Sequence, residues 1–138
     1  MKFEVLSSNN SEVFDTLVSK VREFNFSHMG AKKSEPLSVI VRDDNGNIIG
    51  GVSGRTIYNQ FLIEVLWVAD SFRGQGLGRD LMALAEDKAK LRGCLAAQVD
   101  TLSFQAPDFY QKLGFEVVGK VDGVPDSPER YFLVKRYS

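Results

Sequence analysis

The feature that most constrains this chain is a glycine-rich loop between an apolar strand and a helix. The run Phe61–Ala69 is apolar at almost every position, which is typical of a central strand covered on both faces. The loop Arg73–Gly78 follows it, and leucines and alanines then recur at helical spacing from Leu77 to Leu91. In a strand–loop–helix unit of this kind, backbone N–H groups can approach an anionic ligand closely.

Apolar periodicity elsewhere predicts a mixed α/β fold, of the α+β kind, with helices on both faces of a sheet. Asn9 followed by Glu12 predicts a capping box, with Asn9 as the cap, at the start of a first helix whose apolar residues recur up to Phe24. Asp-Asn-Gly at 44–46 predicts a hairpin turn, and the glycines after it predict a bulge or a close approach. The expected strands are residues 2–6, 37–42, 47–58, 61–69, 95–102, 115–121 and 130–137, with a second helix over 77–91 and a short third helix before Gly114. Residues 1–138 are expected to form a single domain.

Composition and charge exclude several classes of protein. An apolar fraction of 43% and a charged fraction of 25% are ordinary for a globular domain. The net charge of −1 provides no broad positive surface for nucleic acid. The single cysteine, Cys94, and the single histidine, His28, cannot form a disulfide or a Cys/His zinc site, so no metal is expected. Since no apolar run is long enough for a membrane span and the first residues lack a signal-peptide pattern, we expect a cytoplasmic protein with no membrane partner.

The segment Arg73–Gly78, here called the glycine loop, has the features of a pyrophosphate-binding site. Its glycines expose backbone N–H groups, the helix that begins there adds free N–H donors, and Arg73 and Arg79 add positive charge. A Walker phosphate loop would need a lysine followed by serine or threonine, and a dinucleotide-binding loop would need glycine in place of Arg79. A tight strand–helix turn that binds nothing is the alternative.

Arg73, Gly76 and Gly78 fit the pattern Arg-x-x-Gly-x-Gly, which resembles the coenzyme A-binding motif of the GNAT acetyltransferase superfamily. The segment APDFYQKLGF over residues 106–115 is similar to the family's second motif, and one helix and one strand separate the two motifs as the family requires. The resemblance covers nearly the whole chain. It implies a mostly antiparallel central sheet of six to seven strands, acetyl-coenzyme A as co-substrate and a small-molecule amine or peptide as acceptor. Family members often dimerise, so the resemblance leaves a homodimer open.

The resemblance also implies where the co-substrate binds. Backbone N–H groups of the apolar strand, with Val68 as the expected donor, would face the acetyl carbonyl, while the glycine loop holds the pyrophosphate. Tyr110 matches a tyrosine that can protonate the departing thiolate; the alternative is a packed aromatic whose hydroxyl only holds coenzyme A. The family's asparagine seven residues earlier is Ser103 here, whose shorter hydroxyl would have to make that contact. The residues expected at the co-substrate are Leu66, Trp67, Val68, Arg73, Gly74, Gln75, Gly76, Leu77, Gly78, Arg79, Ser103, Phe109 and Tyr110.

Glu64 is the only carboxylate in the apolar strand and lies four residues before Val68, where some family members carry a catalytic glutamate. We interpret it as the general base or as the group that positions a water for the incoming amine. The alternatives are a glutamate that orders the acceptor ammonium, or one that pairs with a nearby arginine. Cys94 is expected in the core. His28 is expected on an ordinary surface loop, with a role in the acceptor site as the alternative.

These residues predict an acetyltransferase that moves the acetyl group of acetyl-CoA to a primary amine by direct attack. The alternative is a non-catalytic module that binds acyl-CoA as a sensor or regulatory partner. Such a module could lose both Glu64 and Tyr110, whereas this chain has both. The sequence therefore favours the enzyme.

Overall fold

The computed structural model of this protein describes residues 1–105 and 107–137. The chain forms two compact units, Met1–Lys33 and Ser34–Ser138. Both motifs named above lie in the second unit; Ala106, the first residue of the second motif, lies outside the described residues.

The first unit contains one described helix, α1 (Ser11–Met29), with Gly30 ending it at a φ of 77°. The side chain of Asn10 caps this helix and accepts a hydrogen bond from the N–H of Val13 at 3.0 Å. The prediction of Asn9 as the cap was wrong by one residue. A capping side chain reaches the N–H of the second or third helical residue, and the helix begins at Ser11.

Residues 2–6, predicted as a strand, have no regular secondary structure. Alternation of apolar and polar residues stabilises a strand only where a neighbouring strand supplies hydrogen-bond partners. Alternation over five residues does not produce a strand here, so this prediction was wrong.

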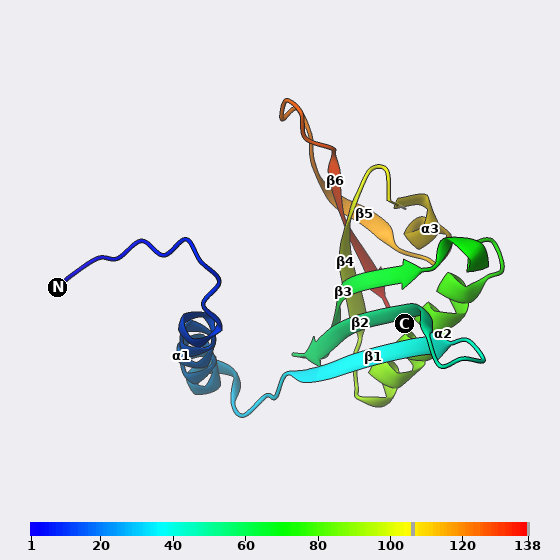
Figure 1. The fold of residues 1–138 in the computed structure, drawn as a ribbon. Helices are drawn as coiled ribbons and strands as arrows, with labels where there is room; N and C mark the ends of the chain where they lie inside the picture. Colours follow the sequence, from blue (N-terminus) through cyan, green and yellow to red (C-terminus); the bar gives the residue numbers. More distant parts are fainter. Residues whose placement is uncertain (106, 138) are drawn as a thin grey trace. The chain divides into compact units, whose positions relative to one another are not determined.

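The second unit is a mixed six-stranded sheet with helices packed against it (Figure 1). Its elements are β1 (Glu35–Arg42), β2 (Ile48–Ile57), β3 (Gln60–Val68), the 3₁₀ helix η1 (Asp70–Phe72), α2 (Leu77–Leu91), β4 (Ala96–Leu102), α3 (Pro107–Lys112), β5 (Glu116–Val121) and β6 (Arg130–Arg136). The strand order is β1-β2-β3-β4-β6-β5; β3 and β4 are parallel and the other neighbours are antiparallel. The predicted fold class is confirmed.

The helix α2 covers β1, β2 and β3, as Figure 1 shows. Its apolar stripe packs against Phe61 of β3, which is completely buried. Burial of a large apolar side chain of this kind contributes about 1.5–3 kcal/mol. Cys94 lies in the same core, as predicted. The buried apolar residues of α2 are Leu81, Met82, Ala85 and Ala89.

Within the second unit, only one face of β3 is covered. Phe61 and Ile63 are buried toward α2, whereas Trp67, on the other face, has 48% of its surface exposed. The expectation of cover on both faces of this strand is not met in this unit. The strand is apolar on both faces for another reason, which is that several of its residues line a pocket.

A β-bulge interrupts β3 just before that pocket. Ser53 of β2 pairs with Val65, but the next residue, Gly54, pairs with Ile63, so Glu64 is an extra residue in β3. An extra residue bends a strand and increases its twist. Of the two alternatives predicted from the glycines of β2, the close approach is confirmed at Gly54, where a Cβ would lie 2.1 Å from the carbonyl oxygen of Leu62; the bulge lies beside it, but its extra residue belongs to β3.

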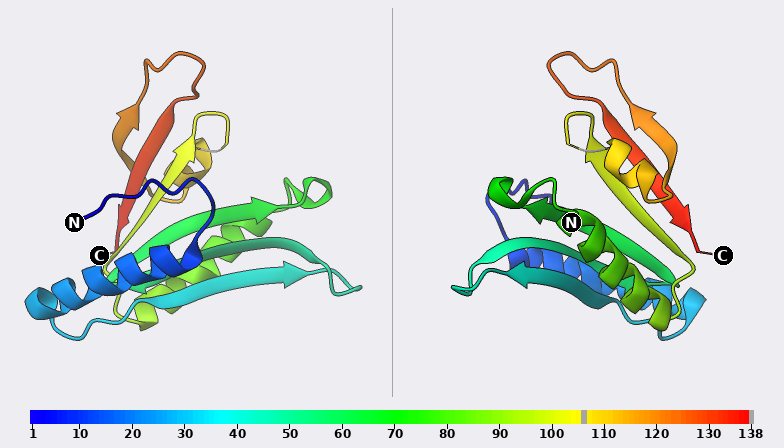
Figure 2. Two further views of the ribbon diagram at one scale, coloured as in Figure 1. Left: turned by 60° about the vertical axis from the view of Figure 1, so that its left-hand side comes forward. Right: turned by 90° about the vertical axis from the view of Figure 1, so that its right-hand side faces the viewer.

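The strands β3 and β4 pair at one end only. Residues Gln60–Leu62 pair in parallel with Ala96–Gln98, and beyond these residues the two strands diverge, as Figure 2 shows. The divergence follows directly after the bulge at Glu64. It leaves the far edge of β3 without a neighbouring strand at the level of the pocket.

Candidate active site

A pocket of about 820 Å³ lies where β3 and β4 diverge. Its volume is in the range of sites that bind small molecules and cofactors. Three parts of the fold meet there: the end of β3, the glycine loop with the start of α2, and the end of β4 with α3. The lining residues are Glu64, Val65, Leu66, Trp67, Val68, Phe72, Arg73, Gly74, Gly76, Leu77, Gly78, Arg79, Val99, Asp100, Thr101, Phe104, Gln105, Phe109 and Tyr110. We call this the β3–β4 pocket.

The glycine loop presents backbone donors to this pocket. Gly74 and Gly76 have φ values of 80° and 82°, a left-handed conformation that glycine adopts at little cost. Hydrogen bonding within α2 begins with the N–H of Asp80, which donates to the carbonyl of Gly76 at 3.0 Å. The N–H groups of the first helical turn before Asp80 have no acceptor within the helix. They can therefore bind an anion, and the positive end of the helix dipole favours one.

The guanidinium of Arg73 joins the start of the glycine loop to the end of β3 and to η1. Its Nε donates to the carbonyl of Val68 at 3.0 Å, and it forms an ion pair with Asp70 at 3.0 Å. Arg73 thus fixes the path of the chain from β3 into the loop, and its pairing with Asp70 offsets part of its positive charge there. Arg79 adds a second guanidinium, which lies over Gly76: a Cβ there would stand 3.0 Å from Nη2 of Arg79.

Gly78 allows the start of α2 to approach α3 closely. A Cβ on Gly78 would lie 3.2 Å from the ring of Phe109, which is tighter than ordinary van der Waals contact. A larger residue at position 78 would therefore require the ring of Phe109 to move by a few tenths of an ångström. This contact brings the two sequence motifs together at one wall of the pocket.

The N–H of Val68 points toward the open edge of β3. The next residue, Ala69, donates its N–H to the carbonyl of Ile49, at the start of β2, at 2.8 Å. Successive N–H groups of a strand point to opposite edges, so the N–H of Val68 points away from β2, to the side where β4 has diverged. The carbonyl of Val68 points the same way, since Arg73 binds it.

Tyr110 lies opposite β3, on α3, and is 6% exposed. Its ring packs edge-on against Phe109 at 5.2 Å and Phe115 at 5.6 Å between centroids. Burial, and secondarily the Asp100 carboxylate, raise the pKa of Tyr110 to about 12. The phenol is therefore protonated at neutral pH and can donate a proton or a hydrogen bond into the pocket.

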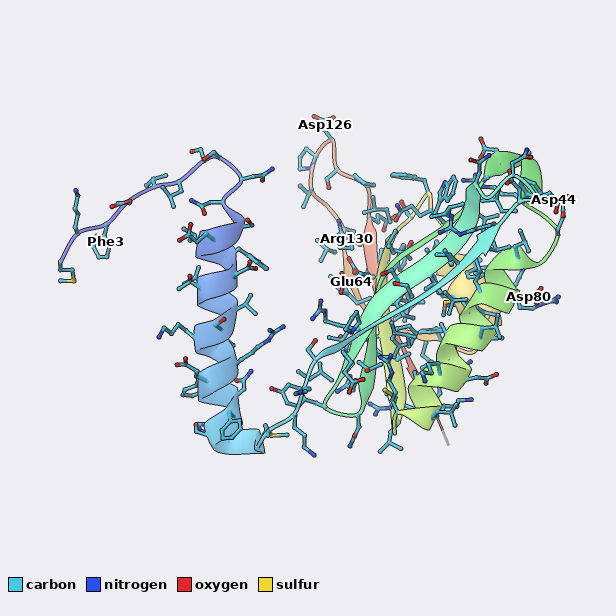
Figure 3. All side chains as sticks on the ribbon, turned by 60° about the horizontal axis from the view of Figure 1, so that its bottom comes forward. Phe3, Asp44, Glu64, Asp80, Asp126 and Arg130 are labelled. Atoms are coloured by element: carbon cyan, nitrogen blue, oxygen red, sulfur yellow. The ribbon has the colours of Figure 1, made fainter. Side chains whose placement is uncertain are left out.

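Glu64 lies at the rim of the pocket on β3 and is labelled in Figure 3, as is Arg130 on β6. Its side chain is 58% exposed, and its Oε1 accepts a hydrogen bond from Nε of Arg55 at 3.1 Å. The structure thus contains the pairing of Glu64 with a nearby arginine that the sequence left open as an alternative to the role of base. Arg130 pairs with Asp100, the other carboxylate on the pocket wall.

Most of the predicted site residues meet at this pocket, but two do not line it. Gln75, at the outer turn of the glycine loop, is absent from the described lining, and so is Ser103, whose N–H donates to the carbonyl of Glu129 at 2.8 Å. Phe104 and Gln105 line the pocket in the place where Ser103 was expected. The sequence offered one signal for these two residues, which is that they follow the predicted strand 95–102. Since that strand is parallel to β3, the loops that follow the two strands lie at the same edge of the sheet.

Among the described residues, no helix is both long and apolar enough to cross a membrane. In the same part of the chain, no three His, Cys, Asp or Glu side chains gather as a metal site would require.

Residues 4–115 match the protein family described as the Acetyltransferase (GNAT) family. A blasticidin-S acetyltransferase from Streptomyces morookaense is 34% identical over 108 residues, which are 78% of this chain and 79% of that protein. An acetyltransferase from Agrobacterium tumefaciens of known structure is 27% identical, with a TM-score of 0.92 over 99% of this chain and 100% of that one. Another from Bacillus cereus is 32% identical, with a TM-score of 0.82 over 96% and 97% of the two chains.

The match spans both sequence motifs and every part of the fold that lines the β3–β4 pocket up to α3. This chain therefore belongs to the GNAT family of acetyltransferases, which use acetyl-CoA.

Proposed function

We propose that this protein transfers the acetyl group of acetyl-CoA to a primary amine of a small molecule or peptide by direct attack. One observation carries the proposal. A single pocket joins the N–H groups of the glycine loop to the open edge of β3, with Glu64 on one wall and Tyr110 on another. An acyl transfer needs an anion-binding end, an N–H donor for the acetyl oxygen, a base and an acid, and this pocket has a candidate for each.

The glycine loop and the first turn of α2 would hold the diphosphate of coenzyme A. Their N–H groups, with the charges of Arg73 and Arg79, suit a doubly charged group. When bound, acetyl-CoA supplies the activated thioester. The N–H of Val68, which points to the open edge of β3, would donate to the acetyl oxygen as negative charge develops on it.

Tyr110 would act as the general acid. A departing thiolate needs a proton, and a thiol has a pKa of about 8.5. With its pKa raised to about 12, the Tyr110 phenol remains protonated through the working pH range and can donate a hydrogen bond to the sulfur as negative charge develops on it. Its burial against Phe109 and Phe115 fixes the direction in which it donates.

Glu64 would remove a proton from the incoming amine, directly or through a water. Alkyl amines are largely protonated at neutral pH, with a pKa of about 10, so the nucleophile must lose a proton before attack. Glu64 lies at the pocket rim and is half-exposed, where an amine can reach it from solvent. Its free oxygen, Oε2, would accept that proton.

The acceptor is proposed to be a small molecule with a primary amine. The support is the name of one relative, a blasticidin-S acetyltransferase that is 34% identical to this chain. A nucleoside-type amine, a polyamine, an amino acid and a peptide N-terminus are the classes to compare.

Thiol release from acetyl-CoA tests the proposal. The purified chain would be assayed with blasticidin S, spermidine, lysine and a short peptide with a free N-terminus, with each product checked by mass spectrometry. We expect at least one amine to give thiol release and an acetylated product. Binding of acetyl-CoA without turnover for any of them would instead support the non-catalytic sensor.

A further inference from the structure

We propose that Arg55 is a positioning residue for Glu64, held in place by Ser34. The inference rests on the proposed function, since it assigns a role in acetyl transfer to a side chain outside the pocket lining. Arg55 lies on β2, and its Nε donates to Oε1 of Glu64 at 3.1 Å. Its Nη1 donates to the hydroxyl of Ser34, just before β1. The three side chains thus form one hydrogen-bonded row from the residue before β1, across β2, to the middle of β3.

The bulge in β3 makes this row necessary. Glu64 is the extra residue of the bulge, with no register partner on β2, so backbone pairing does not fix it as it fixes its neighbours. Its side chain is also 58% exposed, and an exposed glutamate has several rotamers of similar free energy. A hydrogen bond to the carboxylate is needed to hold one of them.

Arg55 provides that hydrogen bond without occupying the whole carboxylate. It binds Oε1, and Oε2 is left for an amine or a water. The two contacts of Arg55 use different nitrogens, Nε and Nη1, of one rigid guanidinium. Because the guanidinium is planar, the contact with Ser34 fixes the direction of the contact with Glu64.

A purely structural role for the pair predicts a different outcome. The side chains of Arg55 and Glu64 are 39% and 58% exposed, and exposed ion pairs contribute roughly 0–1 kcal/mol to stability. If the pair only joined β2 to β3, its loss would slightly lower the melting temperature and leave turnover unchanged. The positioning role predicts instead that loss of the pair lowers turnover.

The test uses four variants of the full chain: Arg55→Met, Arg55→Lys, Ser34→Ala and, as a matched control, Lys120→Met. Lys120 forms an ion pair of similar exposure with Glu129 at 2.7 Å, and neither residue lines the β3–β4 pocket. Rates are measured with acetyl-CoA and whichever amine of the panel named above gives the fastest turnover. We expect Arg55→Met to lower kcat roughly tenfold with little change in KM for acetyl-CoA, since misplacing a catalytic group by about 1 Å can cost up to a hundredfold.

The conservative variants separate charge from position. A lysine keeps the charge but has one nitrogen, which cannot bind Ser34 and Glu64 together in the same geometry. Arg55→Lys and Ser34→Ala should therefore each lose a few-fold in kcat, and Lys120→Met should lose nothing. Full activity of Arg55→Met would overturn the proposal.

A double-mutant cycle decides whether Arg55 acts through Glu64. In a Glu64→Gln background, Arg55→Met should cause little further loss of kcat, because the group that it positions is already disabled. Equal losses in both backgrounds would show that Arg55 acts independently and would overturn the inference, while leaving the acetyltransferase intact. Absence of turnover by the wild type with every amine of the panel would instead reject the proposed function itself.

Discussion

Gly54 of β2 faces the carbonyl of Leu62 on β3 so closely that a Cβ on Gly54 would lie 2.1 Å from the carbonyl oxygen. No side chain fits in that gap. The contact sits at the bulge, where Ser53 pairs with Val65 and Gly54 with Ile63. Before the bulge, at Gln60–Leu62, β3 pairs with β4; after it the two strands diverge around the pocket. Gly54, which is outside the pocket lining, thus lies beside the bulge after which the two strands diverge.

Replacement of Gly54 by alanine should be severe. The obstructing atom belongs to the backbone, so no side-chain rotation can relieve the clash, and we expect a loss of roughly 2–4 kcal/mol in the free energy of unfolding. Gly119 is the matched control, because it also lies beside a register shift, yet a Cβ there would be an ordinary 3.8 Å from Phe132. Urea unfolding of Gly54→Ala and Gly119→Ala checks the prediction. Equal stability of the two variants would contradict it.

Substitution of Gly76 should weaken the binding of coenzyme A. Gly76 has a φ of 82° and a Cβ there would meet the Arg79 guanidinium, so Gly76→Val displaces both the loop backbone and a neighbouring charge. We expect the dissociation constant for coenzyme A, measured by calorimetry, to rise at least roughly tenfold.

Gly46 supplies the control for that experiment. Its φ is 85°, nearly the same as that of Gly76, but it lies in the turn between β1 and β2 and a Cβ there would meet open space. Gly46→Val therefore introduces similar backbone strain, about 1–2 kcal/mol, away from the pocket. An affinity for coenzyme A that falls equally in both variants would mean that strain, and not the site, is the cause.

Much of the fold was predictable because its signals are local. The turn at residues 44–46, the extent of α2 and the glycine loop each depend on a few adjacent residues, and each was found where it was expected. The cap of α1 was misplaced by one residue, because Asn9 and Asn10 are both good caps and only the start of the helix distinguishes them. Residues 2–6 have the strand pattern but form no strand, because alternation over a few residues does not by itself specify one.

Tyr110→Phe should lower kcat more than it raises KM for acetyl-CoA. Proton donation to the leaving sulfur occurs in the transition state, whereas the aromatic ring that packs against Phe109 and Phe115 is retained. We expect a loss of about a hundredfold in kcat, as is common for a general acid. Tyr137→Phe is the control, since Tyr137 is a second tyrosine with a raised pKa and does not line the described pocket. If both variants turned over at the wild-type rate, Tyr110 would have no part in the chemistry.

The stability of the protein should fall in strong alkali, in part because of Tyr110. Its pKa rises from 10.0 to about 12 on folding, chiefly through burial. The folded state therefore keeps this proton between pH 10 and 12, where the unfolded state loses it, so raising the pH through this window favours unfolding. Tyr110 should account for a loss of about 3 kcal/mol at most.

Denaturant titrations at pH 9, 10, 11 and 12 measure this dependence. Tyr110→Phe should remove the part of the alkaline loss of stability that is due to Tyr110. The part due to Tyr137 should remain, because burial also raises the pKa of Tyr137. A variant with the same alkaline slope as the wild type would show that Tyr110 is not buried as described.

The pocket was harder to predict than the fold, because its walls come from segments far apart in sequence. The glycine loop and Tyr110 were found from short motifs. Phe104 and Gln105 carry no motif, and they line the pocket at the place where β4 has diverged from β3, after the bulge at Glu64. The partnership of Arg55 with Glu64 likewise depends on the register of two strands, which a hydropathy pattern does not define.

A crystal structure of the complex with acetyl-CoA tests the central claim most directly. The account predicts the diphosphate on the N–H groups of residues 74–79 and the acyl end between β3 and β4, with its carbonyl toward the N–H of Val68. A complex in which the glycine loop contacts no phosphate and the thioester lies outside the β3–β4 pocket would contradict it.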